Sequence, residues 1–458
     1  MLDLATIVKA YDVRGTVPDQ LNPDVARALG AAFVTVTGAS RIAAGHDMRP
    51  SGPELLAAFA DGATSRGADV VDIGLAATDL LYFASGQLDL PAAMFTASHN
   101  PAQYNGIKMC RAGAQPIGQE SGLVDIRVAA QDYLAHGLPE PVAEPGTVTE
   151  QNLLVDYARY LRGLVDLSGL KPLKVVVDAG NGMAGYTVPA VLGDQALEAL
   201  PLTVVPLYFE LDGTFPNHEA NPLEPANLVD LQKAVVAEQA DIGLAFDGDA
   251  DRCFFVDADG NAVPPSAVTA LVAVRELAKA PGSAVIHNLI TSKAVPEIIA
   301  EHGGRPIRTR VGHSYIKAEM AVTDAVFGGE HSAHYYFRDF WRADTGMLAA
   351  MHVLAALGEQ DRTLAELTAE YSRYSASGEI NSRVEDQAGR VAAVAEAFAD
   401  RTVSTDHLDG LTVQLTGGGW FNVRASNTEP LLRLNVEAAS SEAMSAIRDE
   451  ALAVIRAE

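Results

Sequence analysis

A strand–helix–strand pattern repeats three times along the chain and constrains its fold more than any other feature. Each copy has a short apolar stretch, a stretch of helical periodicity and a second apolar stretch. Parallel strands buried on both faces give such apolar runs and need helix-length connections. The ranges are 41–45, 54–66 and 68–73, then 174–177, 187–192 and 202–205, then 283–286, 293–301 and 306–309. The pattern predicts three similar α/β domains with mixed, largely parallel sheets.

The end of the chain has a different pattern. Strand-like stretches at 411–415, 420–423 and 431–436 follow one another without a helical stretch between them. Three glycines at 417–419 separate the first two, as in a hairpin with a longer turn. A helical stretch at 441–456 follows. This part predicts a smaller C-terminal α+β domain with an antiparallel sheet.

The four patterns suggest four domains. Residues 136–151, rich in Pro, Gly and Glu, form the best candidate for a linker. We predict domains at 1–150, 151–258, 259–368 and 369–458.

Charge and composition limit the possible partners and the location. A net charge of -26 argues against binding to nucleic acid and to anionic membranes. No apolar run approaches the roughly 18 residues that span a bilayer, and the start shows no secretory signal. Cys110 and Cys253 form neither a disulfide framework nor a metal motif. Together these features predict a cytoplasmic protein.

The segment at 96–101 reads Thr-Ala-Ser-His-Asn-Pro and is the first candidate for a reactive site. An apolar run at 90–95 leads into it, so we expect Ser98 on a loop directly after a strand, where folds commonly present reactive groups. A Ser-His pair alone is more often part of a structural turn. The neighbours of Ser98 also differ from those of a G-x-S-x-G nucleophile elbow.

Three carboxylates, those of Asp247, Asp249 and Asp251, follow a strand-like run at 242–246. At alternate positions they would project to one side of an extended segment, where they repel one another unless a cation neutralises them. Oxygen ligands favour Mg²⁺ or Ca²⁺. An EF-hand needs Gly at the sixth position and Glu at the twelfth, but Arg252 and Ala258 stand there. A solvated acidic turn is the plainer alternative, and Arg252 beside the carboxylates speaks for phosphate binding.

Two further loops carry polar side chains suited to a sugar phosphate. Glu330, Ser332 and His334 alternate and could share a face that contacts sugar hydroxyls. A polar structural turn explains them as well, while His-x-x-His without a helical frame is weak for zinc.

The second of these loops lies between two strand-like stretches of the last domain. Arg424, Ser426, Asn427 and Thr428 bring a guanidinium, two hydroxyls and an amide into one loop, which suits a phosphate. Ordinary hairpin chemistry is the alternative.

A glycine-rich stretch at 180–185 matches the dinucleotide pattern G-x-G-x-x-G. Asp178 lies just before it, where its charge would crowd a pyrophosphate. We interpret the glycines as a tight strand-to-helix turn.

Taken together, these loops resemble the α-D-phosphohexomutase superfamily, and most closely its phosphomannomutase/phosphoglucomutase branch. The resemblance covers the whole chain in the same order. It rests on the N-terminal signature at 9–15, the phosphoserine loop at 96–101 with its continuation at 105–108, the metal loop at 247–252, the sugar loop at 328–334 and the phosphate loop at 424–430.

The resemblance implies a central cleft to which each domain contributes one loop. It implies Mg²⁺ held by Asp247, Asp249, Asp251 and a phosphate oxygen on Ser98. Arg14, Lys108 and His313 would surround the transferring phosphoryl group, with one of them as general acid or base. The implied substrate-binding residues are Tyr11, His99, Arg252, Gly312, Glu330, Ser332, His334, Arg424, Ser426, Asn427, Thr428 and Arg433.

The implied activity is that of a phosphomannomutase, an isomerase that interconverts mannose 6-phosphate and mannose 1-phosphate and so supplies a GDP-mannose precursor. Ser98 would carry the phosphoryl group, and a hexose 1,6-bisphosphate would be both intermediate and activator. Action on glucose phosphates is a possible extension. The expected partner is a hexose phosphate, with the protein a monomer or homodimer.

The sugar loop departs from the family pattern at two positions. Relatives of dual specificity usually read Gly-Glu-Met-Ser-Gly-His, but His331 replaces the Met and Ala333 the second Gly. These changes leave the preference between mannose and glucose open. The alternatives are a phosphoglucomutase, a phosphoglucosamine mutase, which usually has Gln at the Met position, or a non-catalytic sugar-phosphate-binding protein. An oxidoreductase built on the glycine pattern is the remaining alternative.

Overall fold

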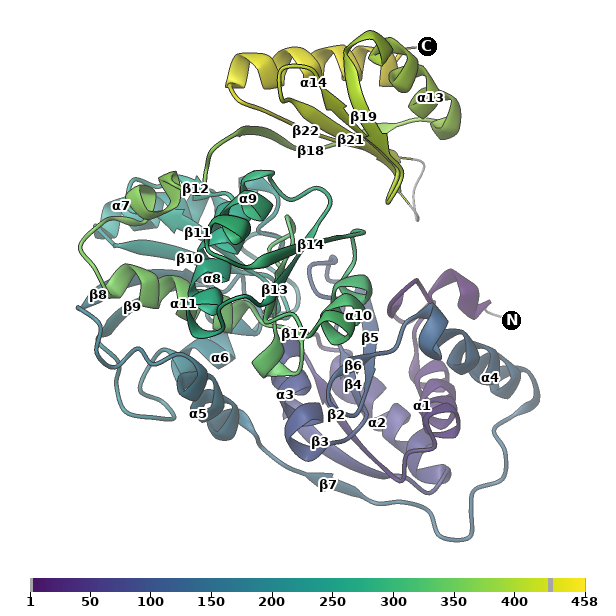
Figure 1. Ribbon diagram of the computed structural model, residues 1–458. Helices are drawn as coiled ribbons and strands as arrows, with labels where there is room; N and C mark the ends of the chain where they lie inside the picture. Colours follow the sequence, from purple (N-terminus) through teal and green to yellow (C-terminus); the bar gives the residue numbers. More distant parts are fainter. Residues whose placement is uncertain (1–2, 427–430, 458) are drawn as a thin grey trace. The chain divides into compact units, whose positions relative to one another are not determined.

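The computed structural model describes residues 3–426 and 431–457, without the side chain of His313. The chain forms two compact units. The first contains Met1–Val263 and Ser332–Ala365, and the second contains Pro264–His331 and Glu366–Glu458. Figure 1 shows their helices and strands.

The N-terminal part of the first unit is built on one mixed sheet of order β1-β5-β4-β2-β3-β7, with β6 paired to β5. β2 pairs in parallel with β3 and β4, while β5 runs antiparallel to β4 and β1. The strands are β1 (Val13–Thr16), β2 (Arg41–His46), β3 (Asp69–Leu75), β4 (Ala92–Phe95), β5 (Tyr104–Arg111), β6 (Gln115–Pro116) and β7 (Val148–Glu150). The helices are α1 (Pro23–Thr37), α2 (Gly52–Ser65), α3 (Thr78–Leu88) and α4 (Leu123–His136).

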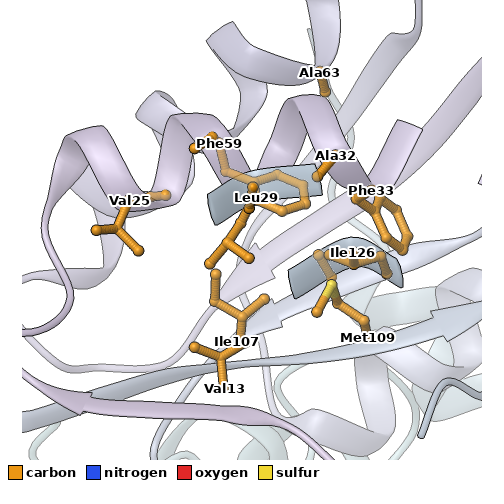
Figure 2. Close-up of a cluster of buried hydrophobic side chains, with 14 of the residues drawn as sticks. Val13, Val25, Leu29, Ala32, Phe33, Phe59, Ala63, Ile107, Met109 and Ile126 are labelled. Atoms are coloured by element: carbon orange, nitrogen blue, oxygen red, sulfur yellow. The ribbon is translucent and has the colours of Figure 1, made fainter. Parts of the chain in front are cut away.

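Helices α1 and α2 form the core of this part with the sheet. The Asn22 side chain caps the start of α1 by accepting from the backbone N–H of Val25. Leu29, Phe33 and Phe59 are fully buried against the sheet (Figure 2). Gly30 allows the two helices to approach closely, since a Cβ there would lie 2.0 Å from the carbonyl oxygen of Phe59.

The rest of the first unit is a second mixed sheet of order β12-β11-β10-β8-β9. β8 pairs in parallel with β9 and β10. The strands are β8 (Leu173–Asp178), β9 (Leu202–Leu207), β10 (Ile242–Phe246), β11 (Cys253–Asp257) and β12 (Ala262–Val263), with helices α5 (Leu154–Leu164), α6 (Ala184–Val191) and α7 (Val229–Glu238). The hairpin of β16 (Tyr335–Phe337) and β17 (Ala343–Asp344), with α11 (Gly346–Gly358), completes the unit.

The second unit contains a parallel group of strands and an antiparallel sheet. β13 (Ala284–Asn288) pairs in parallel with β14 (Arg305–Thr309) and β15 (Phe327–Gly329). Helices α8 (Pro265–Lys279), α9 (Ala294–Glu301) and α10 (His313–Thr323) accompany them, and α12 (Leu364–Ala369) leads onward.

The C-terminal sheet has the order β18-β22-β21-β20-β19, and every pair in it is antiparallel. Its core contains Phe398, Phe421 and Leu434, all fully buried. The elements are β18 (Ser375–Arg383), α13 (Gln387–Ala397), β19 (Thr402–Asp406), β20 (Leu411–Leu415), β21 (Trp420–Ala425), β22 (Leu431–Ala438) and α14 (Ser441–Ile455).

The predicted fold class is confirmed. Each of the three repeats forms a parallel strand pair joined through a helix: β2–α2–β3, β8–α6–β9 and β13–α9–β14. The last part is an antiparallel α+β domain, as predicted. The domain boundaries at 150, 258 and 368 stay predictions. None of the described helices combines the length and the apolar character that a bilayer crossing requires.

Candidate active site

Ser98 lies on a loop that begins directly after β4, as the apolar run before it predicted. The side chain is buried, and the backbone has a φ of 48°, in the left-handed region that a non-glycine residue seldom adopts. The hydroxyl oxygen of Thr96 accepts a hydrogen bond from the Ser98 N–H at 2.9 Å. The loop therefore fixes both the backbone and the direction of this serine.

The carboxylates of Asp247, Asp249 and Asp251 converge, but not on an extended segment. Residues 247–251 form a turn in which the Ala250 N–H donates to the Asp247 carbonyl at 3.0 Å, and Ala250 has a φ of 60°. The expected extended geometry is therefore wrong, since a turn brings the side chains together. One carboxylate oxygen from each aspartate lies within 4.8 Å of the other two.

The carboxylate cluster fits a divalent cation. All three aspartates are at most 2% exposed, and Asp249 Oδ1 and Asp251 Oδ1 accept no hydrogen bond although they are buried. Buried carboxylate oxygens without a partner are costly, and a hard cation that prefers oxygen ligands would satisfy them. This donor set suits a hard divalent cation.

The structure brings Ser98 to this cluster. The Ser98 hydroxyl donates to Asp247 Oδ2 at 2.8 Å. Lys108, on β5, donates from Nζ to Asp249 Oδ2 at 2.7 Å and to Asp251 Oδ2 at 2.6 Å. The predicted carrier serine, the three predicted ligands and the predicted lysine thus share one buried network within the first unit.

Arg252 and His99 complete the surroundings of the serine. The Arg252 guanidinium donates to Asp247 Oδ2 through Nε at 3.0 Å and through a terminal nitrogen at 2.8 Å. The same terminal nitrogen lies 3.5 Å from Ser98 Oγ and 2.6 Å from His99 Nδ1, which itself is 3.1 Å from Ser98 Oγ. Arg252 is therefore placed to meet a phosphoryl group on the serine.

The charges in this network shift its pKa values in different directions. Burial raises the pKa of Asp247 to about 7, against the opposing effect of Arg252. Burial would also raise the pKa of Asp249, but the Lys108 ammonium outweighs it and holds that pKa well below its usual range. Burial and the guanidinium of Arg252 lower the pKa of His99 well below its usual value, so the imidazole is neutral at pH 7.

Arg14 approaches the serine loop from β1. Its Nε donates to Asp12 Oδ2 at 2.8 Å, and a terminal nitrogen donates to the Asn100 side chain and lies 3.4 Å from the Ala97 carbonyl oxygen. Tyr11 directly precedes Asp12 in the segment that leads into β1. The structure thus places Arg14 at the Ser98 loop.

Ser332 and His334 lie in the first unit, near the carboxylates. Ser332 Oγ is 3.0 Å from His334 Nδ1, and His334 Nε2 is 3.7 Å from Asp251 Oδ1. An isolated antiparallel bridge joins the backbones of Arg252 and His334. The sugar loop is therefore tied at this end to the carboxylate loop.

Glu330 belongs to the second unit. Its Oε1 accepts from the Asn288 side chain at 3.2 Å and from the Gly312 N–H at 3.3 Å. Glu330 and Gly312, both predicted to bind substrate, are therefore neighbours. Helix α10 begins at His313, whose side chain is outside the described part of the chain. That Glu330 shares a face with Ser332 and His334 stays a prediction.

The predicted phosphate loop follows β21. Arg424 and Arg433 occupy paired positions on β21 and β22, and both contact Glu379: Arg424 by a short ion pair, Arg433 at 3.5 Å. The Ser426 N–H donates to the Leu431 carbonyl at 2.8 Å. Asn427 and Thr428 lie outside the described residues.

Two residues that the sequence analysis did not identify, Thr78 and Arg49, hold parts of the site in place by hydrogen bonds. Thr78, at the start of α3, donates to Asp249 Oδ2 at 2.5 Å. Arg49, between β2 and α2, is 1% exposed and binds backbone carbonyls of the Ser98 loop. Asp47-Met48-Arg49 stands at the carboxyl end of a parallel strand, where α/β sheets place ligands, and that position was the available signal.

The glycine-rich stretch forms the strand-to-helix turn that we expected. Gly180 and Asn181 both have positive φ, and the Met183 N–H donates to the Gly248 carbonyl at 2.9 Å. A Cβ on Gly182 would lie 2.6 Å from the Gly248 carbonyl oxygen. The turn packs directly against the carboxylate loop.

A fold of three α/β parts and one α+β part, with a buried serine at a carboxylate cluster, defines the class of phosphohexomutases. Models of the phosphoglucomutase/phosphomannomutase family match the chain at 5–128 (domain I), 156–260 (domain II), 264–374 (domain III) and 379–454 (C-terminal domain). The chain belongs to the phosphoglucomutase/phosphomannomutase family and is an enzyme of the isomerase class.

Individual relatives agree with this assignment over nearly the whole chain. A Xanthomonas campestris pv. campestris protein described as phosphohexose mutases is 42% identical over 95% of this chain and 96% of the relative. A phosphomannomutase from Escherichia coli is 38% identical over 98% and 99%. The crystal structure of a phosphoglucomutase/phosphomannomutase family protein from Burkholderia thailandensis matches with a TM-score of 0.88 at 32% identity, covering 100% of this chain and 99% of that one.

Proposed function

We propose that this chain is a phosphomannomutase that interconverts mannose 6-phosphate and mannose 1-phosphate through a phosphorylated Ser98. The observation that carries the proposal is the 2.8 Å hydrogen bond from the Ser98 hydroxyl to Asp247, inside a cluster of three buried carboxylates. Phosphoryl transfer depends mainly on positioning and on neutralising charge, and this network supplies both. The names of several full-length relatives support mannose phosphates as substrates.

Asp247, Asp249, Asp251 and a phosphate oxygen on Ser98 would hold Mg²⁺. The two carboxylate oxygens without a hydrogen-bond partner support this assignment. When bound, the ion supplies neutralisation of the charge that develops as the phosphoryl group leaves.

The other predicted catalytic residues, together with Arg252, would act on the transferring group directly. Arg252 would pair with its oxygens, because its terminal nitrogen already lies 3.5 Å from Ser98 Oγ. Lys108 and Arg14 add positive charge from β5 and β1. One of Arg14, Lys108 and His313 would serve as the general acid or base for the attacked hydroxyl.

The reaction consists of two transfers. In the first, the bond between phosphorus and Ser98 Oγ breaks while a bond forms to the free hydroxyl of the hexose monophosphate, which gives a 1,6-bisphosphate. In the second, the other phosphoryl group of this bisphosphate moves to Ser98 Oγ and frees the product hydroxyl. The same bisphosphate, added in trace amounts, would activate unphosphorylated protein.

The second unit would recognise the sugar and the phosphate that does not react. Glu330 would supply a buried carboxylate for sugar hydroxyls, and Ser332 and His334 are the further candidates for contacts with the sugar. Arg424, Arg433, Ser426, Asn427 and Thr428 would bind the phosphate by charge and hydrogen bonds. Such contacts do not depend on which end of the sugar carries the phosphate, as the two-step reaction requires.

A rate comparison tests the proposal. We expect Mg²⁺-dependent turnover of mannose 1-phosphate, primed by hexose 1,6-bisphosphate, with a slower or comparable rate on glucose 1-phosphate and little on glucosamine 1-phosphate. A dominant rate on glucose 1-phosphate would replace the assignment with phosphoglucomutase. Binding of these compounds without turnover would show a non-catalytic protein. A cytoplasmic location and a monomeric or homodimeric state remain part of the proposal.

A further inference from the structure

Arg49 lies beneath the Ser98 loop with its side chain fully buried. Its two terminal guanidinium nitrogens donate to four backbone carbonyl oxygens, three in that loop and one at Tyr104, the first residue of β5. One nitrogen contacts Pro101 at 2.9 Å and Tyr104 at 2.8 Å, and the other contacts Ser98 at 2.9 Å and Asn100 at 2.6 Å. The side chain thus grips the loop along most of its length.

These contacts hold Ser98 in an unfavourable backbone conformation. A φ of 48° places a residue with a Cβ in the left-handed region, and such a residue persists there only when its surroundings enforce it. Here the Ser98 carbonyl is bound by Arg49, and its N–H is bound by Thr96. Without Arg49, four carbonyl oxygens would lose a hydrogen-bond donor. The Ser98 backbone could then relax from the left-handed region to a more favourable conformation.

The bound Ser98 carbonyl also sets the distance to the carboxylate loop. A Cβ on Gly248 would lie 2.5 Å from the Ser98 carbonyl oxygen, so the two backbones are in direct contact. Gly248 follows Asp247, the residue to which the Ser98 hydroxyl donates. The Ser98 carbonyl oxygen, which Arg49 holds in place, is therefore also the atom that the carboxylate loop contacts.

Arg49 is itself held from two other sides. Asp47 Oδ1 accepts from the Arg49 backbone N–H at 3.0 Å, and Asp47 Oδ2 lies 3.3 Å from Arg49 Nε. The ring of Phe215 covers the guanidinium at 5.2 Å, and a Cβ on Gly213 would lie 2.7 Å from Arg49 Cα. The guanidinium is thus paired with Asp47 and covered by Phe215, and these contacts prevent it from moving away from the loop.

We propose that Arg49 is a positioning residue for phosphoryl transfer: it sets the Ser98 hydroxyl against the carboxylate loop by gripping the carbonyl side of the serine loop. This inference rests on the proposed function, since it presumes that Ser98 carries the phosphoryl group. A planar fork that serves four oxygens cannot be replaced by an ammonium, which has three donors on one atom. Loss of the grip affects the transfer step and not the binding of the sugar phosphate.

Arg162 offers a matched control. It also clamps backbone carbonyls with its whole guanidinium: those of Val191 at 2.8 Å, Glu198 at 2.5 Å and Gly193 at 2.6 Å. These carbonyls belong to the last residue of α6 and to the segment that follows it, which carries no residue of the proposed site. A lysine there removes the same kind of contact without touching the serine loop.

The test compares Arg49→Lys and Arg162→Lys with the unchanged protein, in steady-state turnover of mannose 1-phosphate and in the single-turnover transfer from phosphorylated Ser98. We expect Arg49→Lys to lower kcat and the transfer rate about a hundredfold, as an ångström-scale misplacement does, with KM changed less than about threefold. Arg162→Lys should lower the melting temperature while kcat stays within about twofold. A folded Arg49→Lys protein with an unchanged transfer rate would overturn the proposal.

A milder variant keeps the test decisive if Arg49→Lys does not fold. Phe215→Leu removes the ring that covers the guanidinium but no group that bonds to it, so Arg49 holds the loop less firmly, and we expect kcat to fall severalfold without a change in KM. An unchanged kcat in Phe215→Leu would then contradict the proposal. If the unchanged protein itself shows no turnover, the proposed function fails, whereas full activity in the variants overturns only the role of Arg49.

Discussion

The charged residues of the first unit and those of the second are prepared for their ligands in opposite ways. Around Ser98 the carboxylates are buried and form one network with the neighbouring cations, as Lys108 shows with Asp249 and Asp251. Around the phosphate loop Arg424 and Arg433 are both directed to the single carboxylate of Glu379. The proposed reacting loops are thus preorganised in a buried network, while the proposed recognition loop holds two guanidinium groups on one carboxylate, which a bound phosphate would displace.

Replacing the carrier serine tests the preorganised side most severely. We expect Ser98→Ala to lower kcat at least about a thousandfold, because no other side chain replaces the nucleophile. Intact-mass measurement after incubation with hexose 1,6-bisphosphate should show phosphate on the unchanged protein and none on the variant. Normal turnover by Ser98→Ala would show that Ser98 does not carry the phosphoryl group, and the contrast between the two units would then fail.

Weakening the carboxylate cluster should have the next largest effect. Asp249→Asn keeps the shape of the side chain but removes a charge and a ligand, and we expect kcat at fixed Mg²⁺ to fall on the order of a hundredfold. Raising the Mg²⁺ concentration should recover part of the loss, and a chelator should abolish activity in both proteins. Glu437→Gln removes an equally buried carboxylate from the second unit and should leave the Mg²⁺ dependence unchanged.

The recognition side should respond in KM instead of kcat. Arg424→Gln removes one charged donor to the phosphate, and we expect KM for mannose 1-phosphate to rise about 10- to 100-fold with kcat within a few-fold. Glu379→Gln removes the internal competitor, so KM should fall. A loss of kcat with unchanged KM in Arg424→Gln would contradict the division of labour between the two units.

Burial of the Asp79 carboxyl group should make the free energy of unfolding of the first unit depend on pH. Burial raises the pKa of Asp79 to about 7 from 3.8, although Tyr157 and Thr345 both donate to Oδ2 and oppose the shift. The folded protein therefore binds more protons than the unfolded chain between about pH 4 and pH 7. The free energy of unfolding should fall as pH rises through this window, because the proton that the folded state favours is lost.

Asp79→Asn should remove the contribution of Asp79 to this pH dependence, while Asp247, whose pKa is also raised to about 7, keeps its own. The amide oxygen can accept both hydrogen bonds, and the amide nitrogen takes the place of Oδ1, which has no partner. We expect stability near that of the unchanged protein at pH 4 and higher at pH 8, by on the order of 1 kcal/mol, measured by denaturant unfolding. Asp79→Ala, which loses both hydrogen bonds, should be less stable at pH 4. Equal pH profiles for Asp79→Asn and the unchanged protein would contradict the assignment.

The smallest effect is expected at His331. Its side chain helps to line a cavity of about 270 Å³ in the second unit, together with Tyr374 and Trp420. His331→Met restores the family pattern, and we expect the ratio of kcat/KM for mannose and glucose 1-phosphates to change only a few-fold, as for a small change near one sugar hydroxyl. A change above a hundredfold would make His331 the main determinant of specificity.

Most of the fold could be predicted from sequence because buried parallel strands leave strong local signals. The runs at 174–177 and 283–286 are apolar throughout, and the helices after them have clear periodicity. The return of Ser332–Ala365 to the first unit left no such signal. That placement depends on long-range packing, such as Gly346 against the backbone of Arg252, which local patterns do not record.

For the proposed site, the sequence singled out residues that the structure brings together, Ser98 and the three aspartates, but not the residues that hold them in place. Ser98 and the aspartates stood out because their neighbours and spacing are unusual. The turn at Ala250 was hidden, since alanine seldom adopts positive φ. Arg49 reads as an ordinary loop arginine, which is usually solvated, and only the tertiary structure shows that it is buried under four carbonyl oxygens.

The glycine turn at 180–185 has a consequence for how such chains are sorted by pattern. Three backbone segments lie on one another without side chains between them: Gly182 against Gly248, and Gly248 against Ser98. A methyl group at Gly182 or Gly248 would push these backbone segments apart, so neither position accommodates a larger residue. In this chain the dinucleotide-like signature therefore marks close packing of backbone segments beside the proposed phosphoryl carrier, and a search that takes it for a cofactor motif would assign the chain to the wrong class.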